Sequence, residues 1–474
     1  PPINQYNDVI DVTKLFGTNG IRGIVNKDMT CELSLEIGKA WGTFLHNKIQ
    51  QPSIVIGTDA RLSNNMLKNS VTAGFLATGC HVTDIGIVPT PALQYIVREK
   101  HYHSGVMITA SHNPPEYNGI KGIDSDGTEF AKTTEESIEE IYYNKNSIVK
   151  SWDHVGYADS WSGANELYSQ GIVSNVDSEL IKKHHFHIVL DCGSGAGSVV
   201  TPKLLMKLGC NVKQLYCEPD GHFPGHPSEP VPENVTELIR TVKETNADFG
   251  VVQDGDADRA IFVDEHGEYI WGDRTLSLFA KYITKKRPHS IVVTPVTSST
   301  SIDDVVRENN GKIIRTKVGS PVVARTMRET EAVFGGEENG GFIFPEFQFC
   351  RDSAMTIAKL LELLCMEHRS LSELLSQIPR YEIVKTKVSC SNSLKESLVQ
   401  CIINDVKNNP NIINIDTTDG IKFYFPSGWV LMRPSGTEPI FRIYTESKSQ
   451  KDASELSNLF VNLVLHHRKK LEKK

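Results

Sequence analysis

Residues 254–259 read Asp-Gly-Asp-Ala-Asp-Arg, so three carboxylates alternate with two small residues before a guanidinium. In an extended segment this alternation places all three carboxylates on one side, where like charges repel. A positive ion between them relieves the repulsion, and oxygen ligands suit a hard cation such as Mg²⁺. The apolar run at residues 249–252 predicts that this loop leaves a buried strand. The sequence therefore favours a Mg²⁺ site formed by Asp254, Asp256 and Asp258 over an acidic surface turn.

A serine lies in a second polar loop, residues 109–115, where two prolines stop any helix and stiffen the chain. On such a loop Ser111 can act as a nucleophile or a phosphoryl carrier. No Gly-x-Ser-x-Gly elbow surrounds it, which disfavours acyl transfer. Lys121 follows closely and can neutralise phosphate or move protons. Adjacent residues usually point apart, so His112 is expected to stabilise the loop or contact substrate rather than serve as general base.

Three further segments carry groups suited to a sugar phosphate. Arg22 lies in a glycine-dense segment that lacks dinucleotide-binding spacing, and its guanidinium could reach an anion. In a glycine-bracketed loop, Glu337 and Asn339 offer donors and acceptors for vicinal hydroxyls. A phosphate monoester needs a guanidinium, hydroxyls and a flexible backbone. Those groups occur together in the C-terminal part of the chain, at Arg433, Ser435, Gly436 and Thr437, with Arg442 shortly after.

The elements that must position these loops form an internal repeat. Short β-branched runs recur at residues 53–56, 187–190 and 290–293, and each suits a strand buried on both faces. Roughly 20 to 26 residues later a glycine opens another strand, which leaves room for one crossover helix. A third strand in each block ends in a polar loop, namely the serine loop, the aspartate loop and the glycine-bracketed loop. Because ligands sit beyond the carboxyl ends of such strands, one composite site is predicted.

The remaining chain has a different pattern. Helices are expected at residues 354–366 and 370–379, the second with a capping box of Ser370 and Glu373. Strand candidates at residues 381–384, 421–425, 429–432 and 441–444 precede an amphipathic helix with Leu456, Leu459, Phe460, Leu463 and Val464 on one face. This order indicates a smaller α+β domain. The predicted domains are residues 1–155, 156–260, 261–375 and 376–474.

Net charge, cysteine spacing and the length of apolar segments limit the classes of partner and compartment that we expect. The chain of 474 residues has a formal net charge of −8, which argues against a nucleic-acid binder. Its nine cysteines show no metal-finger spacing and no disulfide framework, as expected in a reducing cytosol. No apolar segment is long enough to span a bilayer, and the first residues lack the layout of a signal peptide. We therefore expect a cytoplasmic protein without a membrane partner.

Four motifs in this order resemble the α-D-phosphohexomutase superfamily. They are the serine loop at residues 109–114, the aspartate loop at 254–259, the sugar loop at 336–341 and the phosphate loop at 433–437. Residues 16–23 look like the family's opening motif, and the resemblance covers essentially the whole chain. The sugar and N-terminal loops look closest to archaeal phosphomannomutases, phosphoglucomutases and phosphoglucosamine mutases. The resemblance implies α/β architecture with four domains: three repeated α/β domains with mixed sheets, then the α+β domain.

The resemblance also implies a mechanism. Ser111 would be phosphorylated and, with the three aspartates, would ligate Mg²⁺. The enzyme would pass its phosphoryl group to a hexose monophosphate, and the resulting 1,6-bisphosphate would reorient and return the other phosphate. Lys121 and Arg22 would transfer protons or stabilise charge, and Arg259 would assist near the phosphoserine. The resemblance assigns sugar hydroxyls to Glu337 and Asn339, and the non-reacting phosphate to Arg433, Ser435, Gly436 and Thr437.

Some features depart from the family pattern. Gly340 and Gly341 end the sugar loop where many bacterial relatives carry histidine, Ser353 stands where glycine is more usual, and Gln253 replaces an apolar residue. Two other functions stay open, a metal-dependent sugar phosphatase and a non-catalytic sugar-phosphate sensor. The preferred hexose, and whether the protein is a monomer or a homodimer, are not decided by any residue.

Overall fold

The computed structural model describes residues 14–17, 19–406, 409–434 and 439–472. They form two compact units. The first comprises the described residues up to Glu268 together with Cys350–Glu367, and the second comprises Tyr269–Phe349 and the described residues from His368 onward. The serine and aspartate loops belong to the first unit, and the sugar and phosphate loops belong to the second.

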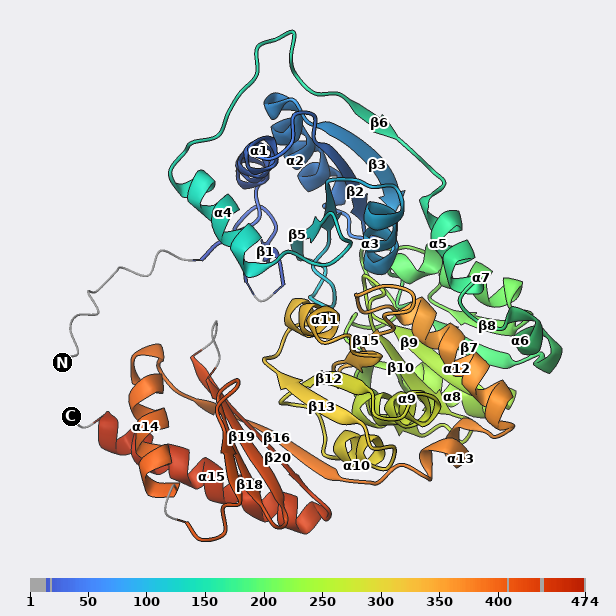
Figure 1. Cartoon of the computed structure of the whole chain (residues 1–474), viewed down its shortest axis with the longest axis vertical. Helices are drawn as coiled ribbons and strands as arrows, with labels where there is room; N and C mark the ends of the chain where they lie inside the picture. Colours follow the sequence, from blue (N-terminus) through green and yellow to red (C-terminus); the bar gives the residue numbers. More distant parts are fainter. Residues whose placement is uncertain (1–13, 18, 407–408, 435–438, 473–474) are drawn as a thin grey trace. The chain divides into compact units, whose positions relative to one another are not determined.

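The first unit contains two mixed sheets with helices packed on them (Figure 1). The first sheet has the order β1-β5-β4-β2-β3-β6. Its strands are β1 (Ile21–Ile24), β2 (Ser53–Thr58), β3 (His81–Ile87), β4 (Ser104–Ile108), β5 (Tyr117–Asp124) and β6 (Ala158–Ser160). Its helices are α1 (Cys31–His46), α2 (Asn64–Thr78), α3 (Thr90–Glu99) and α4 (Lys132–Tyr143).

The second sheet of this unit holds the strand that leads into the aspartate loop. The strands of this sheet that belong to the first unit are β7 (His187–Asp191), β8 (Asn211–Leu215), β9 (Phe249–Gln253) and β10 (Ala260–Asp264). The helices around it are α5 (Ala164–Val173), α6 (Ser178–His184), α7 (Thr201–Lys207), α8 (Thr236–Thr245) and α12 (Ser353–Glu367). Short 3₁₀ turns lie at η1 (Ala196–Val199) and η2 (Pro232–Asn234).

The second unit contains the third α/β sheet, with the order β13-β12-β14-β15. Its strands are β12 (Ile291–Pro295), β13 (Lys312–Thr316), β14 (Phe334–Gly336) and β15 (Phe342–Ile343). The short strand β11 (Tyr269–Ile270), at the start of this unit, is not part of this sheet. The helices of this part are α9 (Gly272–Lys286), α10 (Ser301–Arg307), α11 (Ser320–Glu329) and α13 (Leu371–Leu375). The predicted capping box at the start of α13 is present, because Ser370 and Glu373 exchange the expected hydrogen bonds.

The internal repeat is confirmed by the strand order. The sequences β5-β4-β2-β3, β10-β9-β7-β8 and β15-β14-β12-β13 are the same arrangement. In each, three strands run parallel and a fourth returns antiparallel beside the third. Each polar loop therefore connects the third strand to the antiparallel return strand, and this turn brings polar groups to one edge of the sheet.

The positions of β10 and α12 show which sheets they join. Strand β10 begins at Ala260 and pairs with β9, so the second sheet continues past the expected junction at residue 260. Helix α12 follows the third sheet in the sequence, but it belongs to the first unit, where it packs against α5, α6 and β10. Figure 1 shows this orange helix among the green ones of that unit. The physical reason is that most of its side chains are buried and most of the buried ones are apolar, so it needs cover on several sides.

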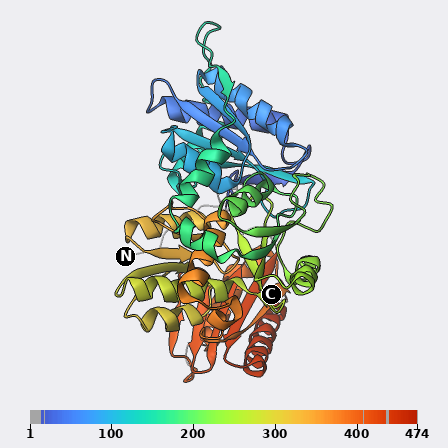
Figure 2. The ribbon, with the colours of Figure 1, turned by 90° about the vertical axis from the view of Figure 1, so that its right-hand side faces the viewer.

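The C-terminal domain has an antiparallel sheet with the order β16-β20-β19-β18-β17, and Figure 2 shows α15 beside its strands. The sequence analysis did not find α14, which packs against α15. The strands are β16 (Glu382–Ser389), β17 (Asn414–Asp416), β18 (Ile421–Phe425), β19 (Gly428–Pro434) and β20 (Ile440–Ser447), and the helices are η3 (Asn392–Leu394), α14 (Lys395–Val406) and α15 (Gln450–Leu471).

The predicted apolar face of α15 is wrong at one position. Phe460 and Val464 are buried in the core of this domain, and Leu456 and Leu463 pack against it. Leu459, in contrast, is 57% exposed. Helical periodicity is 3.6 residues per turn, so Leu459 lies about 100° from Phe460 around the axis and misses the sheet.

Among the described residues, none of the helices combines the length and the apolar character that crossing a membrane requires.

The contrast between these neighbours gives a stability prediction. Phe460→Ala removes a ring that is 1% exposed and packs 5.5 Å from the Phe423 ring, measured between ring centres. We expect the free energy of unfolding of this domain to fall by about 3–5 kcal/mol. Leu459→Ala serves as the matched control and should change it by less than about 0.5 kcal/mol. Urea unfolding measures both, and equal losses would refute this placement of the core face.

Candidate active site

Ser111 lies in the loop between β4 and β5 and faces the aspartate loop. Its Oγ donates a hydrogen bond to Asp254 Oδ2 at 3.0 Å, and the residue is almost fully buried. Its backbone adopts a left-handed conformation with φ of +51°. A non-glycine residue is uncommon there and needs support from its surroundings. Part of that support is Thr109, whose Oγ1 accepts a hydrogen bond from the Ser111 backbone N–H at 2.9 Å.

A buried arginine that the sequence analysis missed holds the serine loop in place. Arg61 lies just after β2 and forms an ion pair with Asp59, and both side chains are fully buried. Asp59 also accepts a hydrogen bond from Thr109 Oγ1 at 2.6 Å. The Arg61 guanidinium donates to four carbonyl oxygens, at Ser111 (2.8 Å), Asn113 (2.6 Å), Pro114 (2.6 Å) and Tyr117 (2.9 Å). One side chain thus satisfies backbone acceptors along the whole loop, which fixes the serine.

The three aspartates converge as predicted, but the segment is not extended. It is a turn in which the Ala257 backbone N–H donates to Asp254 O at 3.0 Å. Ala257 has a left-handed φ of +55°. The alternation argument therefore gives the wrong backbone geometry. The turn, rather than the two-residue period of a strand, aims the carboxylates inward, and one oxygen of each lies within 4.8 Å of the others.

The carboxylate oxygens of the aspartate triad fit a cation, and two of them accept no hydrogen bond from the described residues. All three residues are buried. Asp256 Oδ1 and Asp258 Oδ1 accept no hydrogen bond from any residue that the structure describes. Buried oxygens without partners are costly, and a hard cation satisfies them with ligands of the type it prefers. Burial raises the pKa of Asp254 to about 7. The Arg259 guanidinium opposes this shift, whereas the neighbouring carboxylates of Asp258 and Asp256 add to it.

Lys121, on β5, supplies positive charge from the serine side of this site. Its Nζ lies 2.7 Å from Asp256 Oδ2 and 3.7 Å from Asp258 Oδ2, and its side chain is 1% exposed. Thr90 Oγ1 donates to the same Asp256 oxygen at 2.6 Å. Burial opposes ionisation of Asp256, but the Lys121 ammonium and the Thr90 hydroxyl outweigh it and lower the pKa of that carboxyl. The structure thus places this predicted lysine directly against the aspartate loop.

Arg22, on β1, lies over the serine loop. Its Nη1 donates to Asn113 Oδ1 at 3.2 Å and to Ala110 O at 3.4 Å. Its Nε is buried and donates to no described residue. Burial lowers the pKa of Arg22, although Asp256 and Asp258 oppose the shift. A partly buried guanidinium whose buried Nε is a free donor suits an anion near Ser111.

Arg259 is held by a second carboxylate that the sequence analysis missed. Its Nη1 and Nη2 donate to the two carboxylate oxygens of Glu229 at 3.1 and 3.2 Å, and its Nε donates to Asp254 Oδ2 at 3.0 Å. Burial works against this charge, but the carboxylates of Asp254 and Glu229 more than offset it and raise the pKa of Arg259. Glu229 comes from a proline-rich loop without periodicity, so no sequence signal pointed to it.

His112 and Arg351 complete the rim of the site. His112 Nε2 lies 3.5 Å from Glu229 Oε2. Desolvation and the Arg259 guanidinium lower the pKa of His112. Its Nδ1 lies 3.4 Å from Ser111 Oγ, close to the limit of a hydrogen bond. Arg351, which the sequence analysis did not select, forms an ion pair with Asp258.

The predicted sugar and phosphate residues lie in the second unit. Glu337 is buried and its Oε1 accepts a hydrogen bond from the Gly319 backbone N–H at 3.1 Å. Asn339 Oδ1 accepts from the Gly341 backbone N–H at 3.1 Å. Arg433 forms an ion pair with Asp419 at 2.9 Å and lies opposite Arg442 across β19 and β20. Ser435, Gly436 and Thr437 lie outside the described residues.

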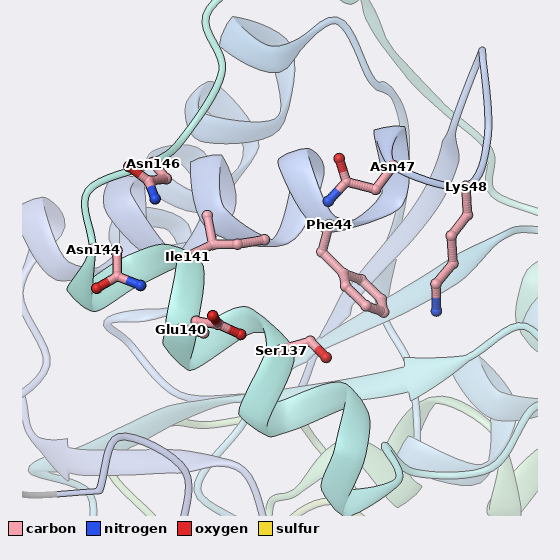
Figure 3. A pocket seen from close by; sticks show the side chains of 8 residues that line it. All are labelled: Phe44, Asn47, Lys48, Ser137, Glu140, Ile141, Asn144 and Asn146. Atoms are coloured by element: carbon pink, nitrogen blue, oxygen red, sulfur yellow. The ribbon is translucent and has the colours of Figure 1, made fainter.

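A surface pocket elsewhere in the first unit contains none of these residues. It lies between α1 and α4, and Figure 3 shows amide and charged side chains around Phe44 and Ile141. Lys48 Nζ lies 4.3 Å from the centre of the Phe44 ring. No side chain of the serine or aspartate loop lines the pocket, so it has no part in the chemistry considered above.

Comparison with known proteins covers both units. Four family models match in order, described as phosphoglucomutase/phosphomannomutase α/β/α domain I (residues 13–148), domain II (166–267), domain III (271–381) and the C-terminal domain (391–463). A solved phosphoglucomutase/phosphomannomutase family protein from Burkholderia thailandensis superposes with a TM-score of 0.84 at 26% identity. That match covers 95% of this chain and 97% of the other.

Two curated relatives match over nearly their whole length. A phosphoglucomutase/phosphomannomutase of Thermococcus kodakarensis is 43% identical over 452 residues, which are 95% of this chain and 98% of the relative. A phosphoglucosamine/phosphogalactosamine mutase of Sulfurisphaera tokodaii is 39% identical, with coverage of 95% and 99%. Together with the matching fold and loop geometry, these similarities show that the chain belongs to the phosphoglucomutase/phosphomannomutase family.

Proposed function

We propose that this protein interconverts hexose 1-phosphates and hexose 6-phosphates by passing a phosphoryl group through Ser111. It is a hexose-phosphate mutase, an enzyme of the isomerase class, as the four matched domains and the relatives' names support. The observation that carries the assignment of Ser111 is its placement. A buried hydroxyl lies 3.0 Å from Asp254 Oδ2, in a site with three aspartates and several cations.

In this mechanism the phosphoserine gives up its phosphoryl group to the free hydroxyl of a hexose monophosphate. The bond between phosphorus and Ser111 Oγ breaks, a bond to the sugar oxygen forms, and the proton of the sugar hydroxyl ends on Ser111 Oγ, which becomes a hydroxyl again. The resulting 1,6-bisphosphate reorients, and its other phosphoryl group returns to Ser111. Phosphoryl transfer depends mainly on positioning and charge neutralisation. Arg22, Lys121 and Arg259 supply that positive charge, and we assign His112 to loop stabilisation or substrate contact rather than to general base.

The aspartate triad is the proposed site of Mg²⁺. Asp254, Asp256 and Asp258 would hold the ion together with an oxygen of the Ser111 phosphate, and the ion would supply charge neutralisation there. The all-carboxylate donor set and the two unpartnered oxygens support this choice. Arg259 keeps Asp254 in place, and Lys121 keeps Asp256 in place, so both carboxylates are oriented before the ion binds.

The second unit would recognise the rest of the substrate. We assign the sugar hydroxyls to Glu337 and Asn339, and the non-reacting phosphate to Arg433, Arg442 and the loop of Ser435, Gly436 and Thr437. The relatives include enzymes named for glucose, mannose and glucosamine phosphates, so the proposed substrate class is a hexose monophosphate with either hydroxyl or amine at C2. One altered contact at that carbon shifts preference by about 1–3 kcal/mol.

Hydrolysis, the chemistry of the alternative phosphatase, is disfavoured by the burial of the serine. Ser111 is 2% exposed and the three aspartates are at most 2% exposed. A phosphoserine in such surroundings is shielded from water, which would otherwise release phosphate. A non-catalytic sensor, for its part, would have no need of a serine positioned by Arg61 and Thr109. The mutase therefore accounts for more of the site than either alternative.

The central test of this proposal is Ser111→Ala. We expect turnover of hexose 1-phosphate to fall at least about 1,000-fold, because the substitution removes the hydroxyl that carries the phosphoryl group. Binding of the sugar phosphate, measured by calorimetry, should persist. Ser137→Ala on α4 is the matched control, since the Ser137 hydroxyl donates a hydrogen bond to the Thr133 carbonyl oxygen within its own helix. Turnover at the wild-type rate in Ser111→Ala would remove the phosphoserine from the mechanism.

The metal assignment predicts a loss of Mg²⁺ affinity in Asp256→Asn. The amide keeps the shape of the side chain but removes the charge, so we expect affinity to fall at least about 10-fold. Asp153→Asn makes the same change at a carboxylate that is 48% exposed and outside the triad, and it should leave affinity unchanged. Calorimetric titration with Mg²⁺ compares the two. An unaltered dissociation constant for Asp256→Asn would show that the triad is not the metal site.

A further inference from the structure

Two cysteines lie side by side at the carboxyl ends of neighbouring strands in the first unit. Cys192 directly follows β7, and Cys217 lies two residues beyond β8. These strands are parallel and pair Asp191 with Leu215, and the Cys192 backbone N–H donates to Leu215 O at 3.2 Å. The two Sγ atoms are 3.2 Å apart. The sheet itself therefore holds the thiols together, although 25 residues separate them in the sequence.

The geometry lets this pair close into a disulfide with little movement. The two residues follow the ends of hydrogen-bonded neighbouring strands, and their Sγ atoms are already 3.2 Å apart. The sulfur atoms need only approach by roughly 1.2 Å to reach the S–S bond length of about 2.05 Å. Cys217 is partly exposed and Cys192 is buried. Burial, together with the hydrogen bond to Cys217, raises the pKa of the Cys192 thiol, so Cys217 meets an oxidant first.

A chain of hydrogen bonds connects this pair to the aspartate loop. Cys192 Sγ donates to Gln253 Oε1 at 3.6 Å. Gln253 Nε2 donates to Ser353 Oγ at 2.6 Å. Ser353 Oγ in turn donates to Ala257 O, between Asp256 and Asp258. Gln253 and Ser353 are two positions at which the sequence departs from the family pattern, and the structure shows that they bond to each other.

We propose that Cys192 and Cys217 are a redox-sensitive modification site that forms a reversible disulfide and thereby adjusts the aspartate loop. With hydrogen peroxide as oxidant, the Cys217 thiolate attacks one peroxide oxygen, giving a sulfenic acid and water. Cys192 then attacks the Cys217 sulfur, the S–O bond breaks, and a second water leaves. Two thiols and one peroxide thus give one disulfide and two waters. A dithiol reductant reverses the bond by exchange.

The disulfide acts on the loop by removing a donor. Once Cys192 has lost its S–H, Gln253 Oε1 is a buried acceptor without that hydrogen bond, and Gln253 must reorient. Its partner Ser353 is then no longer held against Ala257 O. Ala257 has a left-handed backbone conformation that persists only while its surroundings fix it. Oxidation is therefore expected to loosen the turn that aims Asp256 and Asp258, and so to weaken metal binding.

Thiol counting tests the disulfide without any assay of activity. The reduced full-length protein is treated with a slight excess of hydrogen peroxide, denatured and titrated for free thiols. We expect two fewer than the nine that the sequence contains, a peptide linking Cys192 to Cys217 by mass spectrometry, and full recovery with dithiothreitol. In Cys217→Ser, peroxide should not remove a pair of free thiols, because the disulfide partner is missing. Cys401→Ser, at another partly exposed cysteine, should lose the pair as the wild type does.

An oxidised protein that keeps all its thiols, or a pair lost equally in Cys217→Ser, would overturn the proposal. The link to the loop rests on the proposed metal site and is measured separately as the Mg²⁺ dissociation constant before and after oxidation. We expect it to rise about 10-fold in the wild type and to stay constant in Cys217→Ser. A disulfide that forms without changing Mg²⁺ affinity would refute the coupling, whereas a missing disulfide would leave the mutase proposal untouched.

Discussion

The structure of the first unit depends on the repulsion among three buried carboxylates. Asp254, Asp256 and Asp258 present oxygens within 4.8 Å of one another in a place that water does not reach. Like charges so close in a low dielectric are tolerated only when cations surround them. Lys121, Arg259 and Arg351 form ion pairs with these carboxylates. The chain therefore builds a site that already favours positive charge at its centre and anions at its edge.

The repeated topology explains how these charges meet. In each α/β sheet the third parallel strand ends in a polar loop and is followed by an antiparallel return strand. In the first sheet the return strand β5 also carries Lys121, so one hairpin supplies both the serine and a cation. In the second sheet the hairpin supplies the aspartates and Arg259. A single supersecondary unit, used twice, thus provides the two halves of one charge-balanced site.

The sequence predicted those parts of the fold that follow from local pattern. Strands appeared as β-branched runs, the capping box as Ser370 with Glu373, and the aspartate triad as a motif. It could not predict the turn at Ala257, because a left-handed residue other than glycine is stabilised by tertiary contacts. Arg61, Glu229 and Arg351 were missed for a similar reason. Each acts on a loop that is remote in the sequence, so its role follows from tertiary contacts rather than from local pattern.

The account is tested most directly by phosphorus NMR of the purified protein with Mg²⁺ and a trace of hexose 1,6-bisphosphate. Glucose, mannose and glucosamine 1-phosphates are offered separately. We predict that a 1-phosphate resonance is replaced by a 6-phosphate resonance while total organic phosphate stays constant, and that the relative rates identify the preferred sugar. Growth of inorganic phosphate in step with the loss of substrate, or no change with any of the three sugars, would contradict a phosphoserine mutase.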